Sequence, residues 1–219
     1  MSRAVAVLRP EPGNAATAAA IEALGLTAIR LPLFEVHAID WTPPDVTRFD
    51  ALLLTSANAV RLGGEGLHGL RRLPVCAVGE ATADAARNAG FKVAMTGDSG
   101  VAQLLAALPS GPRLLHLCGA DRKSVPRATQ TVTEMVVYQS KPIEAPQLTG
   151  TSGSVTLIHS PRAGQRFAEL VSDRSSISIA AISPAAAEAM GSGWKSVAVA
   201  DRPTDDALLA LAARLCNKC

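Results

Sequence analysis

The sequence predicts an α/β protein in which helices cover both faces of parallel sheets. Short apolar runs recur along the chain, and each is followed by an alanine-rich stretch of helical length. The runs are continuous rather than alternating, which is typical of strands buried on both faces in a parallel sheet. Only 3% of the residues are aromatic, so we expect aliphatic layers of helix on sheet.

The predicted strands and helices alternate along the chain, as they do in βα units. We expect strands at 4–8, 51–55, 75–79, 114–118, 155–159, 179–183 and 197–200. We expect helices at about 14–24, 58–70, 81–89, 101–108, 162–172, 185–191 and 205–215. The chain has 219 residues, which is long for one domain and sufficient for two small ones.

An internal repeat indicates that the two domains share one plan. An apolar run breaks at a serine twice, in LLLTSANAVR and TLIHSPRAGQ, and the serines, Ser56 and Ser160, are 104 residues apart (160 − 56). The stretches 77–86 and 99–108 resemble 181–190 and 203–212 at the same offset. A constant offset across three elements in the same order favours a duplicated α/β unit over chance similarity.

Two further stretches, 31–45 and 136–150, each begin as extended apolar chain and run into prolines. They occupy corresponding places in the two repeats. We therefore expect a pair of connectors between two lobes.

The bulk composition excludes several classes of protein. A net charge of +2 argues against a strongly basic nucleic-acid surface. No run approaches the roughly 20 apolar residues of a membrane helix, and MSRAVAVLRPEPG reaches proline and glycine too soon for a signal peptide. We expect a cytoplasmic protein without a phosphate-binding glycine motif or a nucleophile elbow.

The cysteines and histidines do not predict a metal site. Cys216 and Cys219 form a C-x-x-C pair that we expect to be two incidental thiols on a terminal tail, whereas Cys76 and Cys118 lie in apolar runs typical of a core. None of the four histidines has metal-ligand spacing, and core or edge positions are favoured for His116 and His159.

Several segments together resemble the uroporphyrinogen-III synthase family. They are RPEP after the first strand, LTSANAV, AVGEATADAARNAGF, HSPRAGQRF and VVYQS, which span nearly the whole chain in the family's order. The resemblance implies two doubly wound, interleaved parallel-sheet lobes, one of residues 1–34 plus 142–219 and the other of 39–137. It also implies a two-stranded linker formed by 35–38 and 138–141.

The resemblance implies an activity as well. Family members bind hydroxymethylbilane, a linear tetrapyrrole with eight carboxylates, in the cleft between the lobes. They close it to uroporphyrinogen III while inverting the last pyrrole ring, and they need no metal or organic cofactor. We expect a monomer that takes its substrate by transient hand-over from hydroxymethylbilane synthase and contacts neither nucleic acid nor membrane.

The candidate substrate-binding residues lie where strands end and helices begin. Open α/β sheets bind ligands there, because helix N-termini offer free N–H groups and partial positive charge to anions. The alternative for the serines is that they only cap helices. The candidates are Thr55, Ser56, Asn58, Ser160, Arg162 and Ser183, with Thr82 matching a family threonine and Arg9 ending the first strand.

Tyr138 is the candidate catalytic residue. It is the only tyrosine in the chain and matches the family tyrosine in VYQ. Its hydroxyl would assist the departure of hydroxide from the substrate. The alternative is a tyrosine that packs at the end of an apolar connector with its hydroxyl in water.

Two departures from the family pattern keep other functions open. The turn Ser183-Pro184-Ala185-Ala186 lacks two hydroxyls, and 124–135 is short where family members have a helix and a strand, so we expect one face of the second sheet to be exposed. A non-catalytic two-lobed binding protein for an anionic ligand is the main alternative. A receiver-like interaction module is disfavoured because the first strand ends in Arg9-Pro10, without an acidic cluster.

Overall fold

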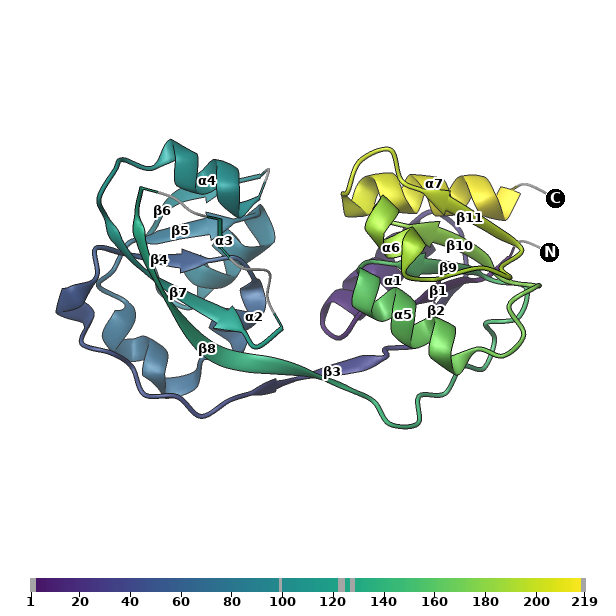
Figure 1. Ribbon diagram of the computed structural model, residues 1–219, viewed down its shortest axis with the longest axis horizontal. Helices are drawn as coiled ribbons and strands as arrows, with labels where there is room; N and C mark the ends of the chain where they lie inside the picture. The colour runs from purple at the N-terminus through teal and green to yellow at the C-terminus, as the bar shows by residue number, and fades with distance from the viewer. Residues whose placement is uncertain (1–2, 99, 122–124, 127–128, 218–219) are drawn as a thin grey trace. The chain divides into compact units, whose positions relative to one another are not determined.

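The structure, a computed structural model, divides into two compact units (Figure 1). It describes residues 3–98, 100–121, 125–126 and 129–217. Unit 1 comprises Met1–Glu35 and Pro142–Cys219, and unit 2 comprises Val36–Lys141. Each unit is built around its own sheet.

Unit 1 contains a five-stranded sheet in the order β11-β10-β9-β1-β2, with parallel pairing between neighbours. Its strands are β1 (Val5–Val7), β2 (Ala28–Arg30), β9 (Val155–Ile158), β10 (Ser178–Ala181) and β11 (Ser196–Val199). Its helices are α1 (Gly13–Ala23), α5 (Pro161–Leu170), α6 (Pro184–Glu188) and α7 (Asp205–Asn217).

Unit 2 is organised around a six-stranded sheet in the order β3-β8-β7-β4-β5-β6. Its strands are β3 (Phe34–Ala38), β4 (Ala51–Leu54), β5 (Val75–Val78), β6 (Val93–Gly97), β7 (Arg113–Gly119) and β8 (Thr131–Pro142). Its helices are α2 (Ala57–Leu62), α3 (Glu80–Asn88) and α4 (Val101–Ala107), with 3-10 helices at Val46–Arg48 and Gly64–Leu70.

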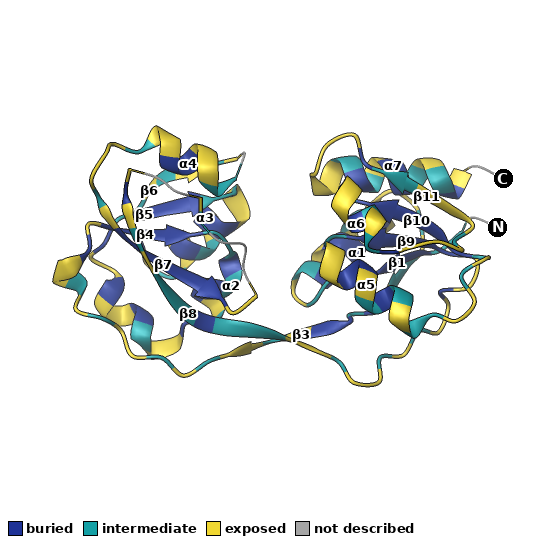
Figure 2. Cartoon of the chain, viewed as in Figure 1, coloured by how far each residue is buried: buried dark blue, intermediate teal, exposed yellow. Residues whose placement is uncertain are grey.

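The central strands of both sheets are buried on both faces, as Figure 2 shows. In unit 1, α5 and α6 pack on one face of the sheet and α1 and α7 on the other. In unit 2, α2 and α3 cover one face and α4 packs on the other. The predicted α/β class with parallel, helix-covered sheets is confirmed.

The same order of strands recurs in the two sheets. β9, β10 and β11 of unit 1 stand in the places that β4, β5 and β6 occupy in unit 2. Ala51 and Val155, which begin β4 and β9, are 104 residues apart (155 − 51), and so are Ala57 and Pro161, which begin α2 and α5 (161 − 57). The offset read from the sequence therefore also relates the elements of the structure.

Two neighbouring strands, β3 and β8, lie where the chain passes between the units. The Ile39 N–H donates to the Val137 carbonyl, and the Ile143 N–H donates to the Leu33 carbonyl. The partners' numbers run in opposite directions, so these two strands are antiparallel. β8 is a single strand of 12 residues.

The connection from β7 to β8 is short, as expected, and none of its described residues is helical. The expected strand is nevertheless present as β8. The prediction that one face of this sheet is exposed is wrong at β7, where Leu114, His116 and Cys118 are buried. The Gln130 side chain helps to close this face, because its amide donates to the carbonyls of Leu105, Leu108 and Pro109.

Three further details differ from the sequence analysis. The helix expected at 58–70 is interrupted at Gly63-Gly64, where Gly64 has a φ of +58°, and continues as a 3-10 helix. Strand β2 is not among the expected strands, because only two of its three residues, Ala28 and Ile29, are apolar. Cys216 is no tail thiol: it lies buried in α7 beside the core, whereas Cys219 is outside the described residues.

Candidate active site

The candidate residues gather at the carboxyl edge of each sheet. In a parallel sheet, all strands end at the same edge, and the helices that follow them begin there. In unit 1 this edge carries Arg9, Ser160 and Ser183, which follow β1, β9 and β10. In unit 2 it carries Thr55 and Ser56 after β4, with Thr82 beyond β5.

Each of the three serines caps a helix. The Ser56, Ser160 and Ser183 Oγ atoms accept hydrogen bonds from the backbone N–H groups of Asn58, Ala163 and Ala186, at 3.2, 3.2 and 3.3 Å. This satisfies N–H groups that a helix start leaves unpaired. All three serines therefore cap helices, which both interpretations of these residues expect, and each hydroxyl still has a hydrogen that it can donate.

Arg9 belongs to a cluster of charged and titratable groups. Its Nη1 donates to Asp205 Oδ2 at 2.7 Å, and Asp205 is the first residue of α7. The other carboxylate oxygen of Asp205 lies 3.8 Å from His159 Nε2. Arg9 is thus partly neutralised by a carboxylate of its own unit.

His159 is neutral at physiological pH. Burial lowers the pKa of its imidazole to about 4, with a further lowering by the Arg9 charge that outweighs the opposing effect of Asp205. Its side chain is 9% exposed, and neither ring nitrogen has a hydrogen-bond partner among the residues that the structure describes. The imidazole therefore adds no charge to the edge of unit 1.

The remaining binding candidates differ in accessibility. The Arg162 guanidinium lies 4.5 Å from the ring centroid of Phe34, in a cation–π contact on an exposed side of α5. Asn58 is half-buried in the first turn of α2. Thr82 is only 5% exposed, so most of this side chain is packed inside unit 2.

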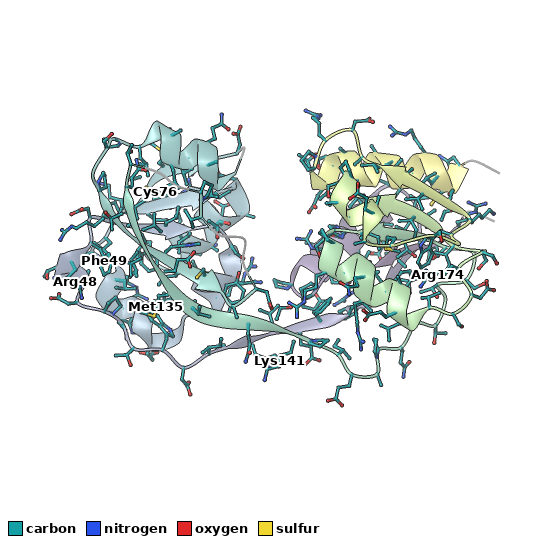
Figure 3. All side chains as sticks on the ribbon, in the orientation of Figure 1. Arg48, Phe49, Cys76, Met135, Lys141 and Arg174 are labelled. Carbon is teal, nitrogen blue, oxygen red and sulfur yellow. The ribbon has the colours of Figure 1, made fainter. Side chains whose placement is uncertain are left out.

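A β-bulge sets the direction of Tyr138. Cys118 pairs with Val136 and Gly119 pairs with Tyr138, so Val137 is an extra residue on β8. As a result, consecutive residues Val137 and Tyr138 both contact the core beneath α2 and α3. Met135, which is labelled in Figure 3, contacts the same core. The Tyr138 ring lies directly over the backbone of Gly119.

Sequence reasoning missed three residues that touch the candidates: Asp205 pairs with Arg9, Gly119 leaves room for Tyr138, and His116 lies beside Thr55. A fourth, Glu134, lies beside His116. His116 had a signal, because it is a lone imidazole in a strand that is otherwise apolar and buried beyond its first residue. The other residues lie far from their partners in the sequence, so no local sequence pattern indicates these contacts.

Neither a metal site nor a membrane span is found in the part of the chain that the structure describes. No three His, Cys, Asp or Glu side chains there are grouped to hold a metal ion. None of the described helices is both long and apolar enough to cross a membrane.

Fold and candidate residues together define an α/β protein of the class that binds ligands at the carboxyl edges of its sheets, and hydroxyl and guanidinium groups lie at those edges here. The family model described as uroporphyrinogen-III synthase HemD matches residues 15–210. No curated protein matches the sequence.

Solved structures show the same fold. Uroporphyrinogen-III synthetase from Helicobacter pylori 26695 matches with a TM-score of 0.67 and 21% identity, over 98% of this chain and 100% of that one. A mutant uroporphyrinogen III synthase from the extremely thermophilic bacterium Thermus thermophilus matches with a TM-score of 0.52 and 19% identity, over 98% and 99% of the two chains.

The family match covers most of the chain, so the chain belongs to the uroporphyrinogen-III synthase family. It is an enzyme of tetrapyrrole biosynthesis, a lyase that closes hydroxymethylbilane to uroporphyrinogen III. The resemblance found in the sequence is confirmed.

Gly119→Ala is expected to displace the Tyr138 ring. A Cβ at this position would lie 2.6 Å from Tyr138 Cε2 and 3.0 Å from its hydroxyl oxygen, so the ring must move. Because the chain has one tyrosine, the NMR signals of labelled tyrosine report this ring alone. Gly69→Ala is the matched control, since no described residue lies within 4 Å of the added methyl group. Unchanged tyrosine signals in Gly119→Ala would contradict the packing of the ring on Gly119.

His159 is expected to make the protein less stable in acid. Unfolded histidine titrates near 6.5 and folded His159 near 4, so between these values only the unfolded state takes up the proton. Stability therefore falls as the pH drops from 6.5 to 4, by up to roughly 3 kcal/mol.

Urea unfolding at pH 7.5 and 4.5 measures this loss. The loss should be smaller in His159→Gln by roughly 2 kcal/mol. His37→Gln, which replaces an exposed histidine in the same way, is the control for the substitution itself. Equal losses in wild type and His159→Gln would show that His159 is not buried as a neutral group.

Proposed function

We propose that this enzyme binds the acetate and propionate groups of hydroxymethylbilane at the carboxyl edges of both sheets and places the Tyr138 hydroxyl beside the departing hydroxyl group. The observation that carries this proposal is the bulge in β8. It holds the chain's one tyrosine against Gly119, at the end of the neighbouring strand. Bulges next to active sites commonly redirect a side chain in this way.

The two units are proposed to be the duplicated, interleaved lobes of the family. Their boundaries would be 1–34 plus 142–219 and 39–137, with 35–38 and 138–141 as the linker strands. Two observations support this division: the compact units change over at Glu35 and again at Lys141, and the strand order recurs in both sheets. Tyr138 would then stand at the beginning of a linker strand.

Capping serines suit a substrate with many negative charges. Eight carboxylates must be held by a chain whose net charge is only +2. A capping hydroxyl accepts a helix N–H and donates its own hydrogen, so Ser56, Ser160 and Ser183 would each serve a carboxylate without adding charge. Arg9, Arg162, Asn58 and Thr82 are proposed as the further partners.

The reaction needs a proton donor and a fixed geometry. The bond between the hydroxymethyl carbon and its oxygen breaks, and the oxygen leaves as water after it gains a proton. The resulting azafulvene cation is attacked by the last ring through its substituted carbon, which gives a spiro intermediate. The older bond from this carbon to its bridging carbon then breaks, the bridging carbon bonds to the free α-carbon of the same ring to close the inverted macrocycle, and that carbon loses a proton, which balances the proton taken up by the leaving oxygen. Tyr138 is proposed to donate a hydrogen bond to the leaving oxygen, and positioning would supply most of the remaining acceleration.

The protein is further proposed to work as a monomer in the cytoplasm and to receive its substrate by transient hand-over from hydroxymethylbilane synthase. Free hydroxymethylbilane closes spontaneously without inversion, so direct hand-over would limit formation of the non-inverted isomer. A non-catalytic ligand-binding protein on the same fold is not favoured, because binding alone gives no reason for the family's sequence pattern over 15–210.

Replacements of Ser160 separate capping from substrate binding. Aspartate and asparagine cap helices about as well as serine, so both variants should remain folded. Ser160→Asp places a negative charge where we expect a substrate carboxylate, and its KM should rise roughly tenfold or more. Ser160→Asn should change KM much less. Equal KM values for the two variants would mean that Ser160 only caps α5.

Tyr138→Phe is expected to slow the reaction without changing its product. With hydroxymethylbilane generated enzymatically, wild type should give isomer III, and Tyr138→Phe should give isomer III with kcat about ten- to a hundredfold lower. Thr133→Val removes another hydroxyl from β8 at an exposed position and is the control. Isomer I alone from folded wild type would refute the proposed function, and an unchanged kcat in Tyr138→Phe would refute the role of Tyr138.

A further inference from the structure

Three polar side chains form a line across strands β4, β7 and β8 of unit 2. Thr55 Oγ1 lies 3.0 Å from His116 Nε2, within hydrogen-bond distance. On the other side of the same ring, His116 Nδ1 lies 3.8 Å from Glu134 Oε1. The imidazole is buried between a strand-end hydroxyl and a carboxylate whose side chain is 29% exposed.

Strand register explains why these residues meet. β7 lies between β4 and β8, and His116 pairs with Leu53 on one side and with Glu134 on the other. Thr55 follows Leu53 by two residues and therefore points to the same face of the sheet. That face otherwise carries apolar side chains, including Leu53 and Leu114. A buried polar ring on such a face needs hydrogen-bonding neighbours.

The position of Glu134 favours one tautomer of His116. Its carboxylate lies 3.8 Å from Nδ1, too far for a direct hydrogen bond, but its negative charge favours hydrogen on Nδ1 over hydrogen on Nε2. Nε2 then holds a lone pair, so the hydrogen bond from Thr55 has one direction: the Thr55 hydroxyl donates and Nε2 accepts. The order of hydroxyl, imidazole and carboxylate has the polarity of a serine-hydrolase triad.

This direction fixes what Thr55 offers to a ligand. Its only hydrogen is used by His116, so its oxygen presents lone pairs alone. A carboxylate would be repelled by that oxygen, whereas an N–H group would be bound. The neighbouring Ser56 has the opposite character, because its oxygen accepts the Asn58 N–H and its own hydrogen remains for an acceptor.

We propose that Thr55 binds a pyrrole N–H of the substrate, and that His116 and Glu134 are positioning residues that hold the Thr55 hydroxyl in its accepting orientation. This inference rests on the proposed function and revises the role of Thr55 from a carboxylate partner to an N–H acceptor. Ionisation of the substrate strengthens the contact, because the azafulvene cation makes its pyrrole N–H a better donor.

The tautomer of His116 can be measured without substrate. In protein labelled with ¹⁵N-histidine, we expect one ring with hydrogen on Nδ1 and a bare Nε2. The signals of this ring are assigned by their loss in His116→Gln or, should that variant not fold, by their shift in Glu134→Gln, which changes a partly exposed carboxylate. A ring with hydrogen on Nε2, or on both nitrogens, would overturn the proposal.

Kinetics test the role in the reaction. Thr55→Val keeps the shape of the side chain but has no acceptor, so kcat should fall about ten- to a hundredfold, while Thr55→Ser should retain most of the activity. Adding His116→Gln to Thr55→Val should cost little more, because His116 acts through Thr55. His68→Gln, in an exposed histidine of the same unit, is the control and should leave kcat unchanged.

The outcomes separate this inference from the proposed function. Isomer III from wild type together with additive losses in the double variant would refute the positioning role alone. Isomer III with full activity in Thr55→Val would refute the N–H contact alone. Isomer I from folded wild type would refute the proposed function, whatever the tautomer of His116.

Discussion

The parallel pairing of strands is the constraint on which the candidate site depends. It brings the ends of β1, β9 and β10 to one edge of the first sheet and the ends of β4, β5 and β7 to one edge of the second. The interiors of the central strands are mostly apolar and buried, and a polar side chain there, such as His116 in β7, needs polar neighbours. Helices begin at the same edges, and their unpaired N–H groups require acceptors. Serine at the strand end satisfies the helix and still has a hydrogen to donate, which is why we propose that the same residue also binds a substrate carboxylate.

The direction of each hydrogen bond matters as much as the position of each hydroxyl. Ser56 and Thr55 are adjacent, yet one accepts from the backbone of Asn58 and the other lies against the ring of His116. A tetrapyrrole needs both kinds of partner, because its carboxylates accept hydrogen bonds and its pyrrole nitrogens donate them. In the proposed site, neighbouring groups of opposite character would distinguish a ring nitrogen from a ring substituent without any change in net charge.

Local sequence patterns predicted most of the fold but few of the side-chain contacts at the candidate site. Continuous apolar runs, the 104-residue offset and the strand-end serines are all visible in short windows of sequence, and the corresponding strands, helices and caps are present. The contacts of Arg9 with Asp205 and of Thr55 with His116 join residues 196 and 61 positions apart. Which strands lie side by side decides such contacts, and no local pattern contains that information. The bulge at Val137 is equally hidden, because alternation along β8 predicts that Tyr138 faces away from the core that Val137 contacts.

Matching edges of the two sheets carry different chemistry. His159 stands in unit 1 where Thr55 stands in unit 2, since each precedes the capping serine of its repeat. The edge of unit 1 presents a neutral imidazole and an arginine already paired with Asp205. The edge of unit 2 presents the Thr55 oxygen after β4 and Tyr138 on β8, two strands away in the same sheet. The substrate is also asymmetric, because only one end loses hydroxide and only one ring is inverted. A plan repeated twice without change would offer the same groups at both edges, whereas His159 in the place of Thr55 gives each edge its own chemistry.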